Sequence, residues 1–189
     1  MTKGLVFDCT AEKPATVVIV MGVSGSGKST IGQVLATRMN AIFLEGDEFH
    51  PPSNVAKMEH GIALTDDDRA PWLQTIVAAV AGVVGAGDCC VVSCSALKRA
   101  YRDILRVGIG QIVRFVYLHG DEATLVARMS SRTGHFMPTS LLQSQIASLE
   151  PPLNEPDVVT IEVEDNPDVI VGKAVAVLRQ LALADKANA

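Results

Sequence analysis

A glycine-rich loop with the sequence GVSGSGKST, at residues 22–30, carries the most specific chemistry in this chain. It follows an apolar, β-branched run and precedes a helical pattern over residues 28–39, the context that a phosphate-binding loop requires. The glycines let backbone N–H groups point at phosphate oxygens, helped by the positive end of the helix. Lys28 would reach the β- and γ-phosphates, and the Ser29 hydroxyl would ligate Mg²⁺. The loop predicts a nucleoside triphosphate site formed by Gly22, Ser24, Gly25, Ser26, Gly27, Lys28, Ser29 and Thr30.

Two carboxylates, Glu45 and Asp47, follow the second apolar run of strand length. In a kinase site, one carboxylate can hold Mg²⁺ through water while another accepts the proton of the attacking hydroxyl. We assign Asp47 as the base and Glu45 to the metal. Turn chemistry and helix capping by acidic residues are the alternative interpretation. His50 either contacts a substrate hydroxyl or satisfies the turn before two prolines, which we expect to break helices.

Two cations, Lys57 and Arg69, flank an acidic run at residues 65–68. That run suits the N-cap and first turn of a long helix, and Pro71 is tolerated near such a helix start. Capping does not explain Arg69, whose planar fork matches a carboxylate. Trp72, the only tryptophan, is more often a core residue than a ligand.

The end of the third strand pattern lacks the aspartate usual at this point in nucleoside triphosphatases, so Mg²⁺ must rely on Ser29 and the carboxylates at Glu45 and Asp47. Lys98 and Arg102 follow, four residues apart and therefore neighbours on one predicted helix face. They would meet an anionic substrate or the transferring phosphoryl group, or form a solvated basic face.

Two arginines one helical turn apart, Arg128 and Arg132, end a helical pattern before a flexible Gly134. This arrangement is typical of a short mobile lid, here residues 128–138, that closes cations over phosphates. Basic residues at a helix C-terminus are the common alternative. The position of the segment after the fourth predicted strand favours the lid.

Apolar runs of strand length alternate with longer amphipathic segments, which indicates an α/β fold with a parallel sheet covered on both faces. Ligands of such sheets bind beyond the carboxyl ends of the strands, where the residues above cluster. No linker divides the chain, so we expect a single domain over residues 1–189 with a core at about 16–184. The expected strands are 17–21, 41–44, 89–94, 112–118 and 158–163, and the expected helices are 28–39, 68–85, 96–106, 122–131, 139–149 and 168–184.

The composition of the 189 residues, 48% hydrophobic and 20% charged, is ordinary for a compact α/β protein. A net charge of −5 argues against a nucleic-acid or membrane-surface partner, although local cations can still bind an anionic substrate. We find no signal-peptide pattern and no apolar run long enough to cross a membrane. The four cysteines lack metal-type spacing, and we expect a cytoplasmic protein with reduced thiols.

In these motifs the chain resembles the gluconokinases, ATP-dependent kinases of D-gluconate in the P-loop kinase superfamily. The resemblance runs from residue 17 to the last predicted helix and is specific because the whole set occurs in this order. The resemblance rests on residues 21–29, 45–47 with His50-Pro51, Asn54 with Lys57-Met58, 64–69, 71–73, 94–98, 101–103 and 134–136.

The resemblance implies a three-layer P-loop kinase fold with a five-stranded parallel sheet, flanking helices and a mobile lid, and usually a homodimer. It implies that ATP and Mg²⁺ phosphorylate the 6-hydroxyl of D-gluconate. Asp47 falls where related shikimate kinases bind the hydroxyl, Arg69 where they grip the carboxylate, and Arg128 where a lid arginine covers adenine. We also assign substrate contacts to His50, Lys57, Ser95, Lys98, Arg102 and His135, and the resemblance implies adenine contacts at Asn166 and Pro167.

Two other functions fit parts of the pattern. A kinase of shikimate or another sugar acid would share the fold and the phosphate loop but differ in the acceptor pocket. A nucleotide-binding switch or regulatory ATPase would need no acceptor, and the combination of Asp47 with Arg69 argues against it. Glu45 stands where some relatives have Asp, which puts its metal role in question.

Overall fold

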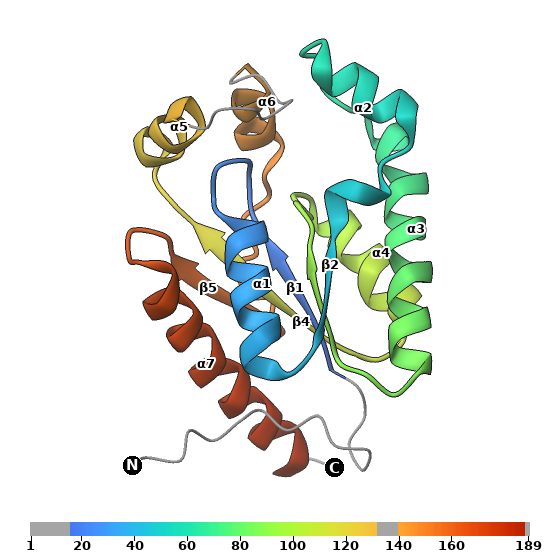
Figure 1. Ribbon diagram of the computed structural model, residues 1–189, viewed down its shortest axis with the longest axis vertical. Coiled ribbons are helices and arrows are strands. Elements are labelled where there is room, and N and C mark those ends of the chain that lie inside the picture. Colours follow the sequence, from blue (N-terminus) through green and yellow to red (C-terminus); the bar gives the residue numbers. More distant parts are fainter. Residues whose placement is uncertain (1–15, 132–139, 188–189) are drawn as a thin grey trace.

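The computed structural model describes residues 16–131 and 140–187. Its centre is a five-stranded sheet in which every neighbouring pair of strands is parallel (Figure 1). The strand order is β2-β3-β1-β4-β5, so the strand that leads into the phosphate loop lies in the middle. The strands are β1 (Thr16–Met21), β2 (Ile42–Glu45), β3 (Cys90–Ser93), β4 (Ile112–His119) and β5 (Val158–Glu162).

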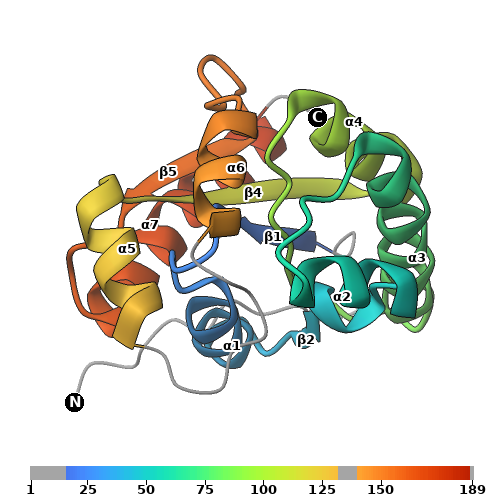
Figure 2. The same ribbon diagram turned by 90° about the horizontal axis from the view of Figure 1, so that it is seen from above.

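Helices follow each strand and cover the two faces of the sheet. Beyond the carboxyl edge of the sheet lie α2, α5 and α6, which surround the phosphate loop when the molecule is seen from above (Figures 1 and 2). The helices are α1 (Lys28–Met39), the short 3₁₀ turn η1 (Gly46–Phe49), α2 (Pro52–Glu59), α3 (Asp66–Gly85), α4 (Arg99–Ile109), α5 (Glu122–Ser131), α6 (Ser140–Ser148) and α7 (Pro167–Ala187).

Strand β1 shows why these segments form three layers. Its side chains from Val17 to Met21 are all fully buried, because helices cover both faces of the sheet. Ile19 packs in the same cluster as Trp72 of α3, whereas Val18 packs with Leu35 of α1 on the opposite face. Successive residues of a strand point to opposite faces, so the side chains of this one apolar run pack into the hydrophobic cores on both sides of the sheet.

All five predicted strands are confirmed, but the sequence does not predict helix α2, and α3 and α4 begin two or three residues from their expected starts. Pro51 and Pro52 do not merely break a helix, since Pro52 begins α2, where a proline is tolerated because the first N–H groups need no partner. Helix α3 begins two residues earlier than expected, with Thr65 and Asp68 in a reciprocal capping box. Helix α4 begins at Arg99 rather than at Ala96, whose φ of 43° is left-handed.

The cysteines require one correction. Cys90 and Cys94 are free and buried, and burial raises the pKa of each thiol to about 12. Cys89 is disulfide-bonded, so the expectation of reduced thiols is wrong for this residue. Within the described residues no helix has the length and apolarity needed to cross a membrane.

Candidate active site

The phosphate loop connects β1 to α1 and needs glycine at its turns. Gly22 has a φ of 143°, and a Cβ there would lie 2.8 Å from the Leu118 carbonyl oxygen. Gly27 is the N-cap of α1 with a φ of 91°, a value that L side chains rarely adopt. Lys28 Nζ donates to the Val23 carbonyl at 3.1 Å. Its ammonium therefore lies against the loop.

The interior of the loop fits an anion. The Ser26 side chain is 1% exposed, and among the described residues its hydroxyl is the buried side-chain polar atom without a hydrogen-bond partner. Buried polar groups are normally paired, so this one points to a group that the loop receives when it is filled. Phosphate oxygens at a helix N-terminus supply such an acceptor.

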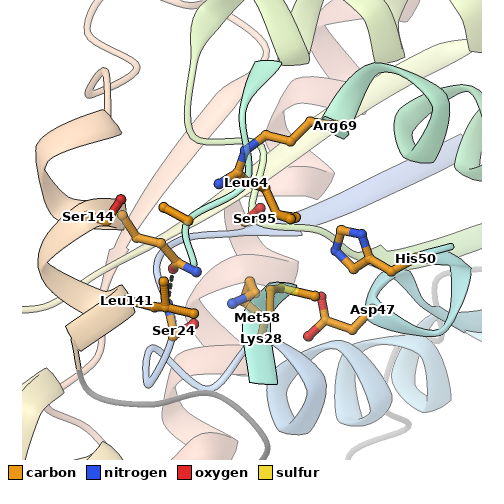
Figure 3. A pocket seen from close by; sticks show the side chains of 12 residues that line it. Ser24, Lys28, Asp47, His50, Met58, Leu64, Arg69, Ser95, Leu141 and Ser144 are labelled. Atoms are coloured by element: carbon orange, nitrogen blue, oxygen red, sulfur yellow. Dashed lines mark hydrogen bonds between the residues drawn. The ribbon is translucent and has the colours of Figure 1, made fainter. Parts of the chain in front are cut away.

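A pocket opens beside the loop at the carboxyl edge of the sheet. Lys28, Asp47, His50 and Arg69 point into the same space in Figure 3, although they come from α1, η1 and α3 and from the residue that follows η1. The structure thus brings together the proposed phosphate-binding lysine, the proposed base and the proposed carboxylate-binding arginine. The full lining is Ser24, Lys28, Asp47, His50, Met58, Ala63, Leu64, Arg69, Ser95, Leu141, Ser144 and Gln145.

Gly46 holds the turn that carries Asp47. Its N–H donates to the Ser93 hydroxyl at 3.1 Å, and its carbonyl accepts from the Trp72 indole at 2.7 Å. The Ser93 hydroxyl in turn donates to the Glu45 carboxylate. Glu45 is therefore tied to the end of β3, the position where the usual metal-linked aspartate is missing, while Asp47 lines the pocket.

His50 lies flat on Trp72, with ring centroids 4.1 Å apart and an interplanar angle of 14°. Burial lowers the pKa of His50 to about 4, and this effect outweighs the opposing effect of the nearby Asp47 carboxylate. The imidazole is therefore neutral at neutral pH and can both donate and accept hydrogen bonds. Trp72 is fully buried, which confirms its assignment to the core.

The basic side chains around the pocket differ in their partners. Lys57 pairs with Asp68, and Lys98 with Asp66, each at 2.7 Å. Arg69 is 8% exposed, its guanidinium lies 5.8 Å from the centre of a tyrosine ring, and no ion pair joins it to a carboxylate within the described part of the chain. Among the described residues, Arg69 is thus a nearly buried cation that faces the pocket without an ion-pair partner.

The assignment of Arg102 to substrate binding is wrong. Its side chain is 1% exposed and donates to both oxygens of Glu155 and to the carbonyls of Ala96 and Leu97. Lys98 instead pairs with Asp66 of α3, so the two cations do not form one solvated basic face. Arg102 instead fixes the loop that carries Ser95, whose side chain does line the pocket.

The proposed adenine side is only partly within the described residues. Arg128 on α5 donates to the carbonyl of Val163, just past the end of β5. Asn166 caps α7 through a 3.1 Å bond from the Val169 N–H, and Pro167 is the first residue of that helix. Arg128 therefore lies beside the segment that leads to Asn166. Arg132, His135 and the lid after residue 131 lie outside the described residues.

Several lining residues were not predicted. Leu141, Ser144 and Gln145 come from α6, Met58 comes from α2, and Leu64 precedes α3. Met58, Leu64 and Leu141 pack in one apolar cluster. The sequence predicts α6 as a helix, but nothing in its residue types marks the face that meets the phosphate loop.

Comparison with known proteins agrees with this geometry. The model of the AAA domain family matches residues 17–152. Gluconokinase from Gluconobacter oxydans is 47% identical over 82% of this chain and 86% of its own, and thermosensitive gluconokinase from Escherichia coli is 43% identical over 90% and 89%. The crystal structure of a gluconokinase from Sinorhizobium meliloti superposes with a TM-score of 0.81 at 48% identity, covering 93% of this chain and 98% of that one. This chain has the fold of the P-loop kinases and belongs to the gluconokinase family.

Proposed function

We propose that this protein transfers the γ-phosphoryl group of ATP to the 6-hydroxyl of D-gluconate, giving 6-phospho-D-gluconate and ADP. The observation that carries the proposal is Arg69, which faces the pocket nearly buried and without a carboxylate partner among the described residues. A sugar acid supplies that carboxylate and, at its other end, a hydroxyl for Asp47. Family membership supports the same substrate.

In this reaction Asp47 orients the attacking hydroxyl and accepts its proton late in the transfer. Lys28 and the backbone N–H groups of the loop stabilise the charge on the transferring phosphoryl group. Magnesium would be held by the Ser29 hydroxyl and, through water, by Glu45, and it would supply further charge neutralisation at the phosphates. The described residues contain no cluster of three or more His, Cys, Asp or Glu side chains suited to a metal, so the phosphates themselves would complete the site.

The remaining contacts are proposed by position. Neutral His50 would exchange hydrogen bonds with acceptor hydroxyls, and Ser95 lines the same pocket. Lys57 and Lys98 would act from the rim, because each is already paired with an aspartate of α3. A further acceptor contact would come from the lid residue His135.

On the nucleotide side, Arg128 would cover the adenine, opposite Asn166 and Pro167. Arg132 would approach the phosphates from the lid at 128–138. We further propose one kinase domain over residues 1–189 that works as a cytoplasmic homodimer.

The test is ADP release with Mg-ATP and a panel of acceptors: D-gluconate, shikimate, gluconolactone, glucuronate and glycerate. A rate with gluconate alone, abolished in Lys28→Ala, is expected. A rate with another sugar acid would indicate a related kinase with a different acceptor. Hydrolysis that no acceptor changes, from folded protein, would indicate a regulatory ATPase instead.

Arg69→Ala tests the carboxylate contact. Hydrogen bonds to charged groups contribute roughly 1.5–3 kcal/mol, so we expect the KM for gluconate to rise by about 10- to 100-fold. The KM for ATP should stay near its original value, since Arg69 is distant in sequence and role from the phosphate loop. Arg99→Ala, which changes an exposed arginine of α4, is the matched control. Equal increases in both KM values would remove Arg69 from the acceptor site.

A further inference from the structure

Gln145 of α6 touches the phosphate loop directly. Its Oε1 accepts a hydrogen bond of 2.7 Å from the backbone N–H of Ser24. The Gln145 side chain is 9% exposed, and both residues line the pocket that holds Asp47 and Arg69. The Gln145 carboxamide therefore contacts the phosphate loop and also lines the proposed acceptor pocket.

A phosphate oxygen of bound nucleotide could also accept the hydrogen bond of the Ser24 N–H. A backbone amide has a single hydrogen to donate, and the amides of a glycine-rich phosphate loop serve phosphate oxygens when nucleotide is bound. While Gln145 accepts the Ser24 N–H, that donor is not available to a phosphate. Nucleotide binding and the Gln145 contact thus compete for the same hydrogen.

The helix that carries Gln145 is held at several points. Leu142 of α6 is fully buried and packs in one cluster with Val23 of the phosphate loop and Leu125 of α5. Just after α6, the N–H of Glu150 donates to the Leu97 carbonyl at 3.0 Å. A flexible glutamine on a fixed helix can exchange one hydrogen-bond partner for another without moving the fold.

We propose that Gln145 is a positioning residue that couples acceptor binding to the phosphate loop. With the pocket empty, its carboxamide caps the Ser24 N–H. A polyhydroxy acid in the pocket offers hydroxyl groups that compete for the same carboxamide, which releases the Ser24 N–H to the terminal phosphate. Acceptor and nucleotide therefore bind with positive cooperativity, an inference that rests on the proposed gluconate kinase function.

The experiment is calorimetric titration of the full chain with a non-hydrolysable ATP analogue and Mg²⁺, with and without saturating D-gluconate. In the unmodified protein we expect gluconate to tighten analogue binding by about five-fold or more, the lower end of usual coupling between sites. Gln145→Met keeps the side-chain length but loses the strong acceptor. The analogue should then bind with the same affinity whether or not gluconate is present.

Two further variants provide a matched control and a second test of the Gln145 contact. Gln143→Met changes the same residue type on the same helix at an exposed position bonded to Glu122, and it should keep the full gluconate effect. Gln145→Glu still accepts the Ser24 N–H, more strongly because it is charged, and adds a negative charge beside the phosphates. Its analogue affinity should fall, most of all without gluconate, and it carries the test if Gln145→Met does not fold.

The outcomes separate this inference from the function on which it rests. A gluconate effect of equal size in the Gln145→Met and Gln143→Met variants overturns the coupling, as does the lack of any effect in the unmodified protein that still phosphorylates gluconate. If gluconate is neither bound nor phosphorylated, the proposed function falls, and the coupling falls with it.

Discussion

Three cations near the pocket, Lys57, Lys98 and Arg69, differ in whether an acidic side chain pairs with them. The Lys57 ammonium, through its hydrogen bonds, lowers the pKa of Asp68 to about 2, and Lys98 lowers the pKa of Asp66. These lysines are compensated before any ligand arrives. Within the described residues no carboxylate forms an ion pair with Arg69, so this guanidinium is the one of the three cations with which an anionic acceptor would pair. The planar fork of that group also selects a carboxylate by geometry.

His50 leads to a prediction about acid stability. Burial against Trp72 lowers its pKa from 6.5 to about 4, so the unfolded chain binds the proton more readily than the folded protein. The stabilising contribution of neutral His50 is complete above pH 6.5 and is lost as the pH falls towards 4. Urea unfolding of the unmodified protein and of His50→Gln should therefore show a smaller difference in unfolding free energy at pH 4.5 than at pH 7.5. A pH-independent difference for His50→Gln would mean that His50 is not held neutral by the fold.

At the scale of elements, the short turn η1 decides where the proposed base stands. A Cβ added to Gly46 would overlap the carbonyl oxygen of Ser93, and the backbone of Gly46 is bonded on both sides. Gly46→Ala must therefore displace the turn and with it Asp47. A misplacement of about 1 Å can cost roughly 100-fold in rate, so we expect kcat to fall by about that factor while ATP still binds.

The matched control for this change is Gly82→Ala in α3, where an added Cβ meets nothing within 4 Å. There alanine should leave kcat unchanged and stabilise the protein by about 0.5–1 kcal/mol, because glycine costs that much inside a helix. Steady-state rates and urea unfolding check both variants. A Gly46→Ala protein with full kcat would show that the position of Asp47 does not limit the reaction.

Elements also show what the sequence can and cannot predict. The five strands are predictable because buried parallel strands are continuous apolar runs. The phosphate loop and Asp47 are predictable because each follows such a run directly. The burial of Arg102 cannot be predicted from the sequence, because its partner Glu155 is 53 residues away in the chain. Gln145 is missed for the same reason, because helical periodicity does not reveal which loop a helix face will meet.

For the whole molecule, an ion-pair network ties the middle of the chain to the segment before β5. Glu155 accepts from Arg102 and Arg106, and Arg106 also binds Asp157 at 2.7 Å. The Arg102 and Arg106 guanidinium groups, chiefly that of Arg102, lower the pKa of Glu155 to about 2. This network links the loop that carries Ser95 to the chain that follows α6.

We expect Arg102→Met to lower the unfolding free energy by about 3 kcal/mol, because removing one partner leaves a buried carboxylate with less compensation. The double variant Arg102→Met/Glu155→Met should recover part of the loss. In urea unfolding, Arg99→Met at an exposed pair should cost less than about 1 kcal/mol. An Arg102→Met protein of normal stability but with a raised KM for gluconate would restore Arg102 to the acceptor site.

The position of β1 in the middle of the sheet has a consequence for partial opening of the molecule. Its backbone is bonded to β3 on one side and to β4 on the other, whereas β2 is a four-residue edge strand. Amide hydrogens of β1 should exchange with water only when the whole sheet opens, while those of β2 can exchange through local fraying. The phosphate loop follows the central strand, and Asp47 follows the edge strand. Local opening at this edge would therefore displace Asp47, the proposed base, while the phosphate loop keeps its place.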